Sequence, residues 1–130
     1  MTQREFKLVV EKALAGLPRG IRERLENIAV VVEDLPGEDV LDEMGIEDPY
    51  DLLGLYQGIS LERRGFYYGN VLPDKISLYQ KAIEAQCRSR KEMMSTIQEV
   101  VLHEIGHYFG LDDAKLQELL DKADGERGGC

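Results

Sequence analysis

The sequence has no long apolar run and no leader pattern. None of its hydrophobic segments approaches the roughly 18 residues that a membrane-spanning helix needs. Near the start, Glu5, Lys7 and Glu11 interrupt the apolar residues, so the hydrophobic region of a secretory signal peptide is missing. We therefore expect a cytoplasmic protein that does not associate with a membrane.

Cysteine is almost absent, with only Cys87 and Cys130 in 130 residues. Two cysteines do not make the disulfide framework of a small secreted domain. Cys130 ends the Gly-rich segment GERGGC at 125–130, which we expect to be a disordered tail. Cys87 has no candidate base near it in the sequence, so we interpret it as a packing residue rather than a nucleophile.

Basic residues are scarce, because 16 Lys and Arg stand against 25 Asp and Glu and the net charge is −9. Such a chain lacks the positive surface that phosphate binding requires, so we predict no nucleic acid partner. The segment from Glu26 through Glu62 contains eleven acidic residues and no Lys or Arg. We interpret it as a solvated acidic surface, or alternatively as the rim of a cleft that disfavours acidic substrates.

The remaining composition is that of one globular domain. With 130 residues, 43% of them hydrophobic, and no internal repeat, the chain can bury one core without disulfides. Helical spacing of apolar residues predicts helices at 2–17, 21–26, 82–88, 91–109 and 112–123, with a helical turn at 39–44. Compact or alternating apolar segments predict strands at 28–32, 52–60 and 75–80. We expect an α+β fold in which a small mixed sheet packs on helices.

Two of the predicted strands carry further expectations. Gly54 and Gly58 interrupt the strand at 52–60, and glycine inside a strand indicates a bulge or a close backbone approach. Residues 75–80 alternate polar and apolar side chains, which is typical of a half-exposed strand. We therefore expect 75–80 to be an edge strand on which an extended peptide pairs by β-augmentation.

The only two histidines, His103 and His107, lie four residues apart in the segment HEIGH. Residues i and i+4 share one face of a helix, so both imidazoles can bind one metal ion. Zinc is the ion that such a pair typically binds, with a third protein ligand and a water in catalytic sites. Glu104 lies about 100° around the helix from His103, which places its carboxylate beside a metal-bound water.

The helical phase of the two histidines supports a ligand role. With His103 at zero, His107 falls near 40° around the helix. The apolar residues of the same helix cluster between about 120° and 200°: Met94, Ile97, Val101, Ile105 and Tyr108. The histidines therefore project away from the centre of the apolar stripe, whereas core histidines would lie inside it.

A third ligand must be a residue of another type, since no further histidine exists. Gly110 can end the helix in a left-handed conformation and turn the chain back toward the metal, and Asp112 and Asp113 follow. Residues 103–113 then match the extended zinc-peptidase motif HExxHxxGxxH, with Asp113 in place of the third histidine. A carboxylate is an acceptable zinc ligand, but either aspartate could instead cap the next helix. We favour Asp113 as the ligand and Asp112 as the cap.

The sequence resembles the short bacterial zincin-like metallopeptidases, which are also described as minimal zincins. The resemblance extends over nearly the whole chain. It rests on the segments LLGLYQG (52–58), LPDKISLYQ (72–80) and VLHEIGHYFGLDD (101–113). It implies one reduced zincin domain over 1–124, with the HExxH motif on a helix, followed by the Gly-rich tail at 125–130.

The same resemblance implies a zinc-dependent peptidase that acts on a peptide or protein substrate. Its metal ligands would be His103, His107 and Asp113, and its general base would be Glu104. In that mechanism Glu104 takes a proton from the attacking water and passes it to the leaving amine. A tyrosine hydroxyl could stabilise the oxyanion, and the candidates are Tyr67, Tyr68 and Tyr79.

Two other functions compete with this one. All four methionines precede His107, so the Met-containing turn of the larger metzincins is missing, and only 17 residues follow Asp113. This departure favours a binding module that keeps the zincin scaffold and a metal without catalysis, although such a module has no need of Glu104. Two histidines and one aspartate also form an iron(II) facial triad, which leaves Glu104 unexplained. The oligomeric state stays open, and a monomer is compatible with the sequence.

Overall fold

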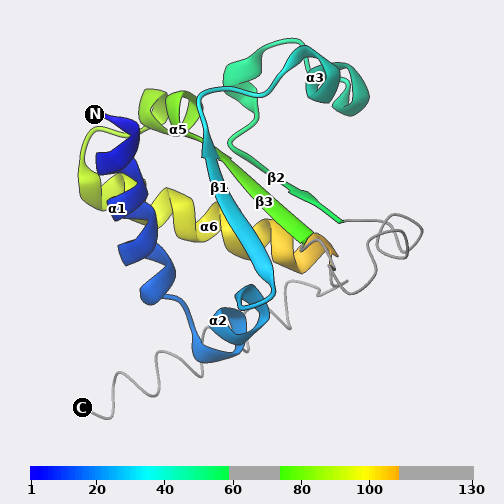
Figure 1. Ribbon diagram of the computed structural model, residues 1–130. Helices are drawn as coiled ribbons and strands as arrows, with labels where there is room; N and C mark the ends of the chain where they lie inside the picture. Colours follow the sequence, from blue (N-terminus) through cyan, green and yellow to red (C-terminus); the bar gives the residue numbers. More distant parts are fainter. Residues whose placement is uncertain (59–73, 109–130) are drawn as a thin grey trace.

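The computed structural model describes residues 1–58 and 74–108, which form a three-stranded sheet with helices around it (Figure 1). The helices are α1 (Gln3–Ala15), α2 (Arg19–Leu25), α3 (Glu38–Met44), the short 3-10 helix η1 (Pro49–Asp51), α5 (Gln80–Gln86) and α6 (Arg90–Tyr108). The strands are β1 (Ile28–Glu33), β2 (Gly54–Gln57) and β3 (Asp74–Tyr79). This confirms the predicted α+β fold. The helix predicted at 112–123 and the tail at 125–130 lie outside the described residues.

Local sequence signals explain where α1 begins and which face it buries. The hydroxyl of Thr2 accepts a hydrogen bond from the backbone N–H of Glu5 at 3.1 Å, as an N-cap residue does. The buried residues of α1 recur at helical spacing: Phe6, Val9, Val10 and Ala13. This face packs on α6, where the side-chain amide of Gln98 donates to the carbonyl oxygen of Ala13 at 2.9 Å.

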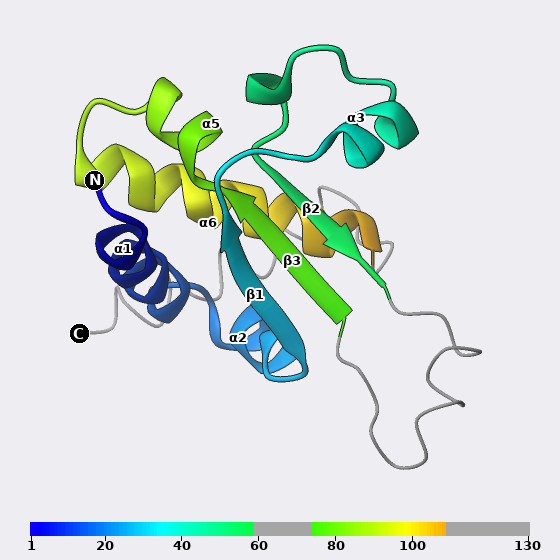
Figure 2. The ribbon, with the colours of Figure 1, turned by 45° about the horizontal axis from the view of Figure 1, so that its top comes forward.

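The strand order within the described sheet is β1-β3-β2. β1 runs parallel to β3, with Val30 opposite Ile76, and β2 runs antiparallel to β3, with Gly54 opposite Leu78. The sheet is therefore mixed, as predicted. Figures 1 and 2 show α6 crossing behind the strands with α1 beside it.

The prediction that residues 75–80 form an edge strand is wrong. β3 is the central strand of the described sheet, and Ile76, Ser77 and Leu78 are fully buried. Alternation indicated exposure because Ser77 is polar, but both faces of β3 are covered and the Ser77 side chain is buried on the face opposite Ile76 and Leu78. The neighbouring strands come from distant parts of the chain, so the alternation within 75–80 carries no information about them. Residue 80 belongs to α5 rather than to the strand.

The core lies between the sheet and the helices behind it. Buried residues from α1, β3 and α6 form one cluster: Phe6, Val9, Val10, Ala13, Ile76, Leu78, Met93, Ile97, Val101 and Ile105. Val30 and Val32 of β1 pack against this cluster from the same face of the sheet. The core therefore holds α6, which carries the HEIGH segment, against the sheet.

The described part of the acidic segment forms a solvated surface. All ten acidic residues from Glu26 to Asp51 are exposed, which agrees with the first interpretation of this segment, and Glu62 lies outside the described residues. The half-buried thiol of Cys87 donates a hydrogen bond to the Thr96 hydroxyl at 3.4 Å, consistent with a packing role. None of the described helices has the length and apolarity that crossing a bilayer would require.

Candidate metal centre

The helix α6, which carries the HEIGH segment, is capped by side chains at its start. At its start, the Ser89 hydroxyl accepts from the backbone N–H of Glu92 at 3.1 Å, and the Glu92 carboxylate accepts from the N–H of Arg88 at 2.7 Å. This is close to a capping box, and the sequence SRKE (89–92) already contains its pattern. The buried residues Met93, Ile97, Val101 and Ile105 recur every four residues and fix the rotation of the helix.

The rotation of α6 brings the two histidines together on its exposed side. His103 and His107 are both exposed, and the centroids of their rings lie 4.3 Å apart with an angle of 56° between the ring planes. The apolar stripe through Val101 and Ile105 faces the core instead. The predicted phase of the histidines is therefore confirmed, since they lie away from the buried stripe and beside each other.

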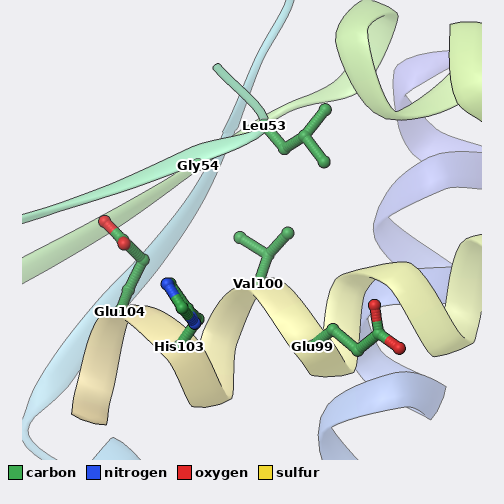
Figure 3. A pocket seen from close by; sticks show the side chains of 6 residues that line it. All are labelled: Leu53, Gly54, Glu99, Val100, His103 and Glu104. Atoms are coloured by element: carbon green, nitrogen blue, oxygen red, sulfur yellow. The ribbon is translucent and has the colours of Figure 1, made fainter. Parts of the chain in front are cut away.

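A cleft of about 280 Å³ runs between α6 and the beginning of β2. Figure 3 shows the side chains that line it. One wall is formed by Leu53 and Gly54, and the other by Glu99, Val100, His103 and Glu104 of α6. His103 and Glu104 thus reach the same cavity from neighbouring positions on the helix, so a ligand in the cleft would contact both.

The carboxylate of Glu104 is held at the strand side of this cleft. Its Oε1 atom accepts a hydrogen bond from the backbone N–H of Tyr56 in β2 at 3.0 Å, and the contact is partly buried. The two residues are 48 positions apart in the chain. The sequence indicated Glu104 but not its partner, because the donor is a main-chain N–H and the identity of residue 56 does not predict it.

Gly54 allows β2 to lie directly on α6. A Cβ atom at this position would lie 2.5 Å from the Val100 Cγ1 atom and 3.0 Å from the carbonyl oxygen of Ser77. Any larger residue would therefore have to displace the Val100 side chain and press against the Ser77 carbonyl. The close approach that glycine in 52–60 predicted is confirmed at Gly54, and it sets the width of the cleft.

Replacing Gly54 by Ala is expected to lower the free energy of unfolding by about 1–3 kcal/mol, the usual cost of overpacking. Thermal or denaturant unfolding measures this loss. The matched control is the same substitution in a Val100→Ala background, where the nearest atom in the way has been removed. We expect Gly54→Ala to cost less in that background, and equal costs would contradict the contact with Val100.

The remaining predicted site residues have different outcomes. Asp112, Asp113, Tyr67 and Tyr68 lie outside the described residues. Tyr79 is only 1% exposed and does not line the cleft, so its hydroxyl cannot serve a substrate there. Burial, and next the nearby Glu33 carboxylate, raise the pKa of the Tyr79 hydroxyl above its usual value. Within residues 1–58 and 74–108, no group of three or more His, Cys, Asp or Glu side chains could hold a metal ion.

The sequence profile of a family described as zincin-like metallopeptidase matches residues 25–123. The chain belongs to the zincin-like metallopeptidase family. The family is described as one of metallopeptidases, so the match agrees with the fold and with the resemblance seen in the sequence. No curated protein matches the chain.

The part of this zincin-like metallopeptidase that matches the family includes the cleft and the HEIGH segment. The match begins at the end of α2 and covers β1, β2, β3, α5 and α6. Helix α1 precedes it, yet α1 packs against α6 and contributes four residues to the core. The N-terminal helix thus supports the element that carries the candidate metal ligands.

Proposed function

We propose that this zincin-like metallopeptidase is a zinc-dependent enzyme that hydrolyses peptide bonds in a peptide or protein substrate. The observation that carries the proposal is the pairing of two exposed imidazoles on α6, one of which shares a cleft with the neighbouring carboxylate. The rings of His103 and His107 lie 4.3 Å apart, and Glu104 lines the cleft beside His103. A binding module would need the imidazoles but not this carboxylate.

The donor groups present fit a zinc ion. Neutral imidazole is a preferred zinc ligand, and two imidazoles one helical turn apart can share one ion. His103 and His107 would hold the metal together with Asp113, the carboxylate that follows Gly110 in the motif. When bound, zinc lowers the pKa of a coordinated water and polarises the carbonyl of the scissile bond.

Glu104 supplies the proton transfer in this proposal. Its carboxylate accepts the proton of the attacking water and donates it to the leaving amine. A carboxylate has two oxygens, so one can keep the hydrogen bond from Tyr56 while the other handles the proton. The general base is thereby held at the strand side of the cleft without losing its function.

Within the described sheet, the edge of β2 that faces away from β3 is the proposed place for the substrate main chain. The backbone N–H of Tyr79 donates to the carbonyl of Leu53 at 2.9 Å. In an antiparallel pair, residues that bond to the partner strand alternate with residues that do not, so this bond shows which residues of β2 bond to β3. The N–H and carbonyl of Gly54 then point away from β3 and toward the cleft that Gly54 lines. An extended peptide can pair with both groups by β-augmentation. β2 therefore replaces residues 75–80 as the strand with which we expect the substrate to pair.

The charge of the cleft favours neutral or basic substrates. Among the described residues that line it, Glu99 and Glu104 are carboxylates and none is Lys or Arg. Nearby carboxylates repel acidic side chains and attract basic ones, most strongly where low-dielectric walls exclude water. We therefore expect peptides with basic or uncharged residues near the scissile bond to be cleaved first.

The test uses the tag-free full chain loaded with zinc and a peptide library that contains basic, neutral and acidic members. We expect cleavage that a chelator abolishes and added zinc restores, since a contaminating serine peptidase would survive the chelator. Metal analysis of the chain as purified should find about one zinc per chain. A monodisperse, zinc-loaded chain that cleaves nothing would overturn the peptidase proposal in favour of a binding module.

The choice of Asp113 over Asp112 as the third metal ligand is a separate prediction. Asp113→Ala should weaken zinc binding far more than Asp112→Ala, because only the first removes a proposed ligand. Asp112→Ala should instead lower the free energy of unfolding by about 0.5–2 kcal/mol, as the loss of an N-cap does. Zinc titration and thermal unfolding of the two variants measure both effects. The opposite pattern would move the third ligand to Asp112.

A further inference from the structure

Two residues of β2 have main-chain N–H and carbonyl groups that point away from β3. Because Leu53 bonds to Tyr79, the alternation of an antiparallel pair makes Leu55 and Gln57 bond to β3 as well. The main-chain polar groups of Gly54 and Tyr56 face away from β3, and the N–H of Tyr56 meets the Glu104 side chain of α6 there. Gly54 and Tyr56 are therefore the β2 residues whose main chain can act in the site.

The N–H of Tyr56 is already engaged by the side chain of Glu104 at 3.0 Å. A charged acceptor makes this type of hydrogen bond shorter and stronger than one between neutral groups. A glutamate has several rotatable bonds, so without such a contact its carboxylate would sample many positions in the cleft. The contact restricts Glu104 to the strand side.

The contact is built into the packing of β2 on α6. Gly54 lies on Val100, and two residues further along the strand Tyr56 meets Glu104, which is four residues further along the helix. Two strand residues advance by about 6.6 Å and four helix residues by about 6 Å, so strand and helix stay in register between the contacts. The missing side chain of Gly54 thus brings the donor of Tyr56 within reach of Glu104.

The side chain of Tyr56 fixes the strand at the same place. Its hydroxyl donates to the Asp74 carboxylate at the start of β3 at 2.8 Å. Tyr56 stands opposite Ile76 in the register, so Asp74 is its diagonal neighbour on the adjacent strand. The residue that donates to Glu104 is therefore tied to the central strand by a second, independent hydrogen bond.

We propose that Tyr56 is the positioning residue of the general base. Its main-chain N–H holds the Glu104 carboxylate at the edge of β2, and its hydroxyl holds that part of β2 on β3. This inference rests on the proposed peptidase function and adds a constraint on the substrate. Since Glu104 occupies the N–H of Tyr56, the peptide main chain pairs with Gly54 and not with the N–H of Tyr56.

Amide hydrogen exchange measured by NMR on the full chain tests the contact without any activity assay. Glu104→Ala should accelerate exchange of the Tyr56 amide by about 10- to 100-fold, the loss of one hydrogen bond to a charged group. The amides of Leu55 and Gln57, which face β3, are internal controls and should not change. Unchanged exchange at Tyr56 in Glu104→Ala would overturn the proposal, whatever the activity of the protein.

A pair of variants tests the functional role of the contact. Tyr56→Pro and Tyr56→Ala both remove the side chain, but only proline lacks the N–H, and proline is tolerated where a strand N–H faces outward. We expect kcat of Tyr56→Pro to be about 10- to 100-fold below that of Tyr56→Ala, as misplacement of a catalytic group costs. KM and zinc content should match between the two variants.

The two arms separate the possible failures. Equal kcat values for Tyr56→Pro and Tyr56→Ala, with both variants folded by thermal unfolding, would overturn the positioning role. If proline unfolds the chain, the exchange result decides the proposal alone. A wild-type chain that binds zinc but cleaves nothing would overturn the proposed function and the positioning role with it, while the exchange result would still establish or refute the Tyr56–Glu104 contact.

Discussion

Glu104→Gln is expected to lower peptide hydrolysis by about 10²–10⁴-fold, the usual contribution of general acid–base catalysis. The reason is chemical rather than structural. A glutamine side chain has nearly the same shape, and its amide oxygen can still accept the hydrogen bond from Tyr56. It cannot, however, take a proton from the attacking water.

The controls for this variant are zinc content and thermal unfolding, which should both match the wild type. Glu99→Gln is the matched comparison, because Glu99 lines the same cleft and its substitution removes the same charge. We expect Glu99→Gln to retain hydrolysis and to change only the preference for basic over neutral peptides. If Glu104→Gln retained most of the wild-type activity, Glu104 would not be the base.

His103→Ala and His107→Ala are each expected to weaken zinc binding by more than about 100-fold, since loss of a mere supporting group already costs 10–100-fold. Both side chains are exposed, so the folded state should change little, within about 0.5 kcal/mol in the free energy of unfolding. Zinc titration with a competing chelator and thermal unfolding of the metal-free chain measure the two quantities.

Ser95→Ala is the matched control, because Ser95 is exposed on the same helix two turns before His103. It should change neither zinc affinity nor stability. The decisive variant combines His103→Ala with His107→Ala, which removes both imidazoles of the chain. Stoichiometric zinc retained by that double variant would refute the assignment of both ligands.

The sequence by itself determined the helix that carries the candidate site. Contacts along a helix join residues three or four apart, so the stripe of Ile97, Val101 and Ile105 and the opposite face with His103 can be derived from spacing alone. At the start of the helix the spacing favoured Met94, whereas the structure buries Met93 and leaves Met94 half-buried. The family motif likewise depends on residues close together in the chain. The third ligand, Asp113, stays a prediction because it lies outside the described residues.

Only the tertiary structure decided what surrounds that helix. Whether a strand is central or at an edge depends on which other segments pair with it. For β3 these are β1 and β2, and the residues of β1 that pair with β3 lie more than 40 positions earlier in the chain. The same holds for Glu104, whose partner Tyr56 is 48 residues away and contributes a main-chain N–H that every residue except proline has. Sequence analysis therefore identified the catalytic candidate, whereas its position was set by non-local pairing, which local periodicity does not encode.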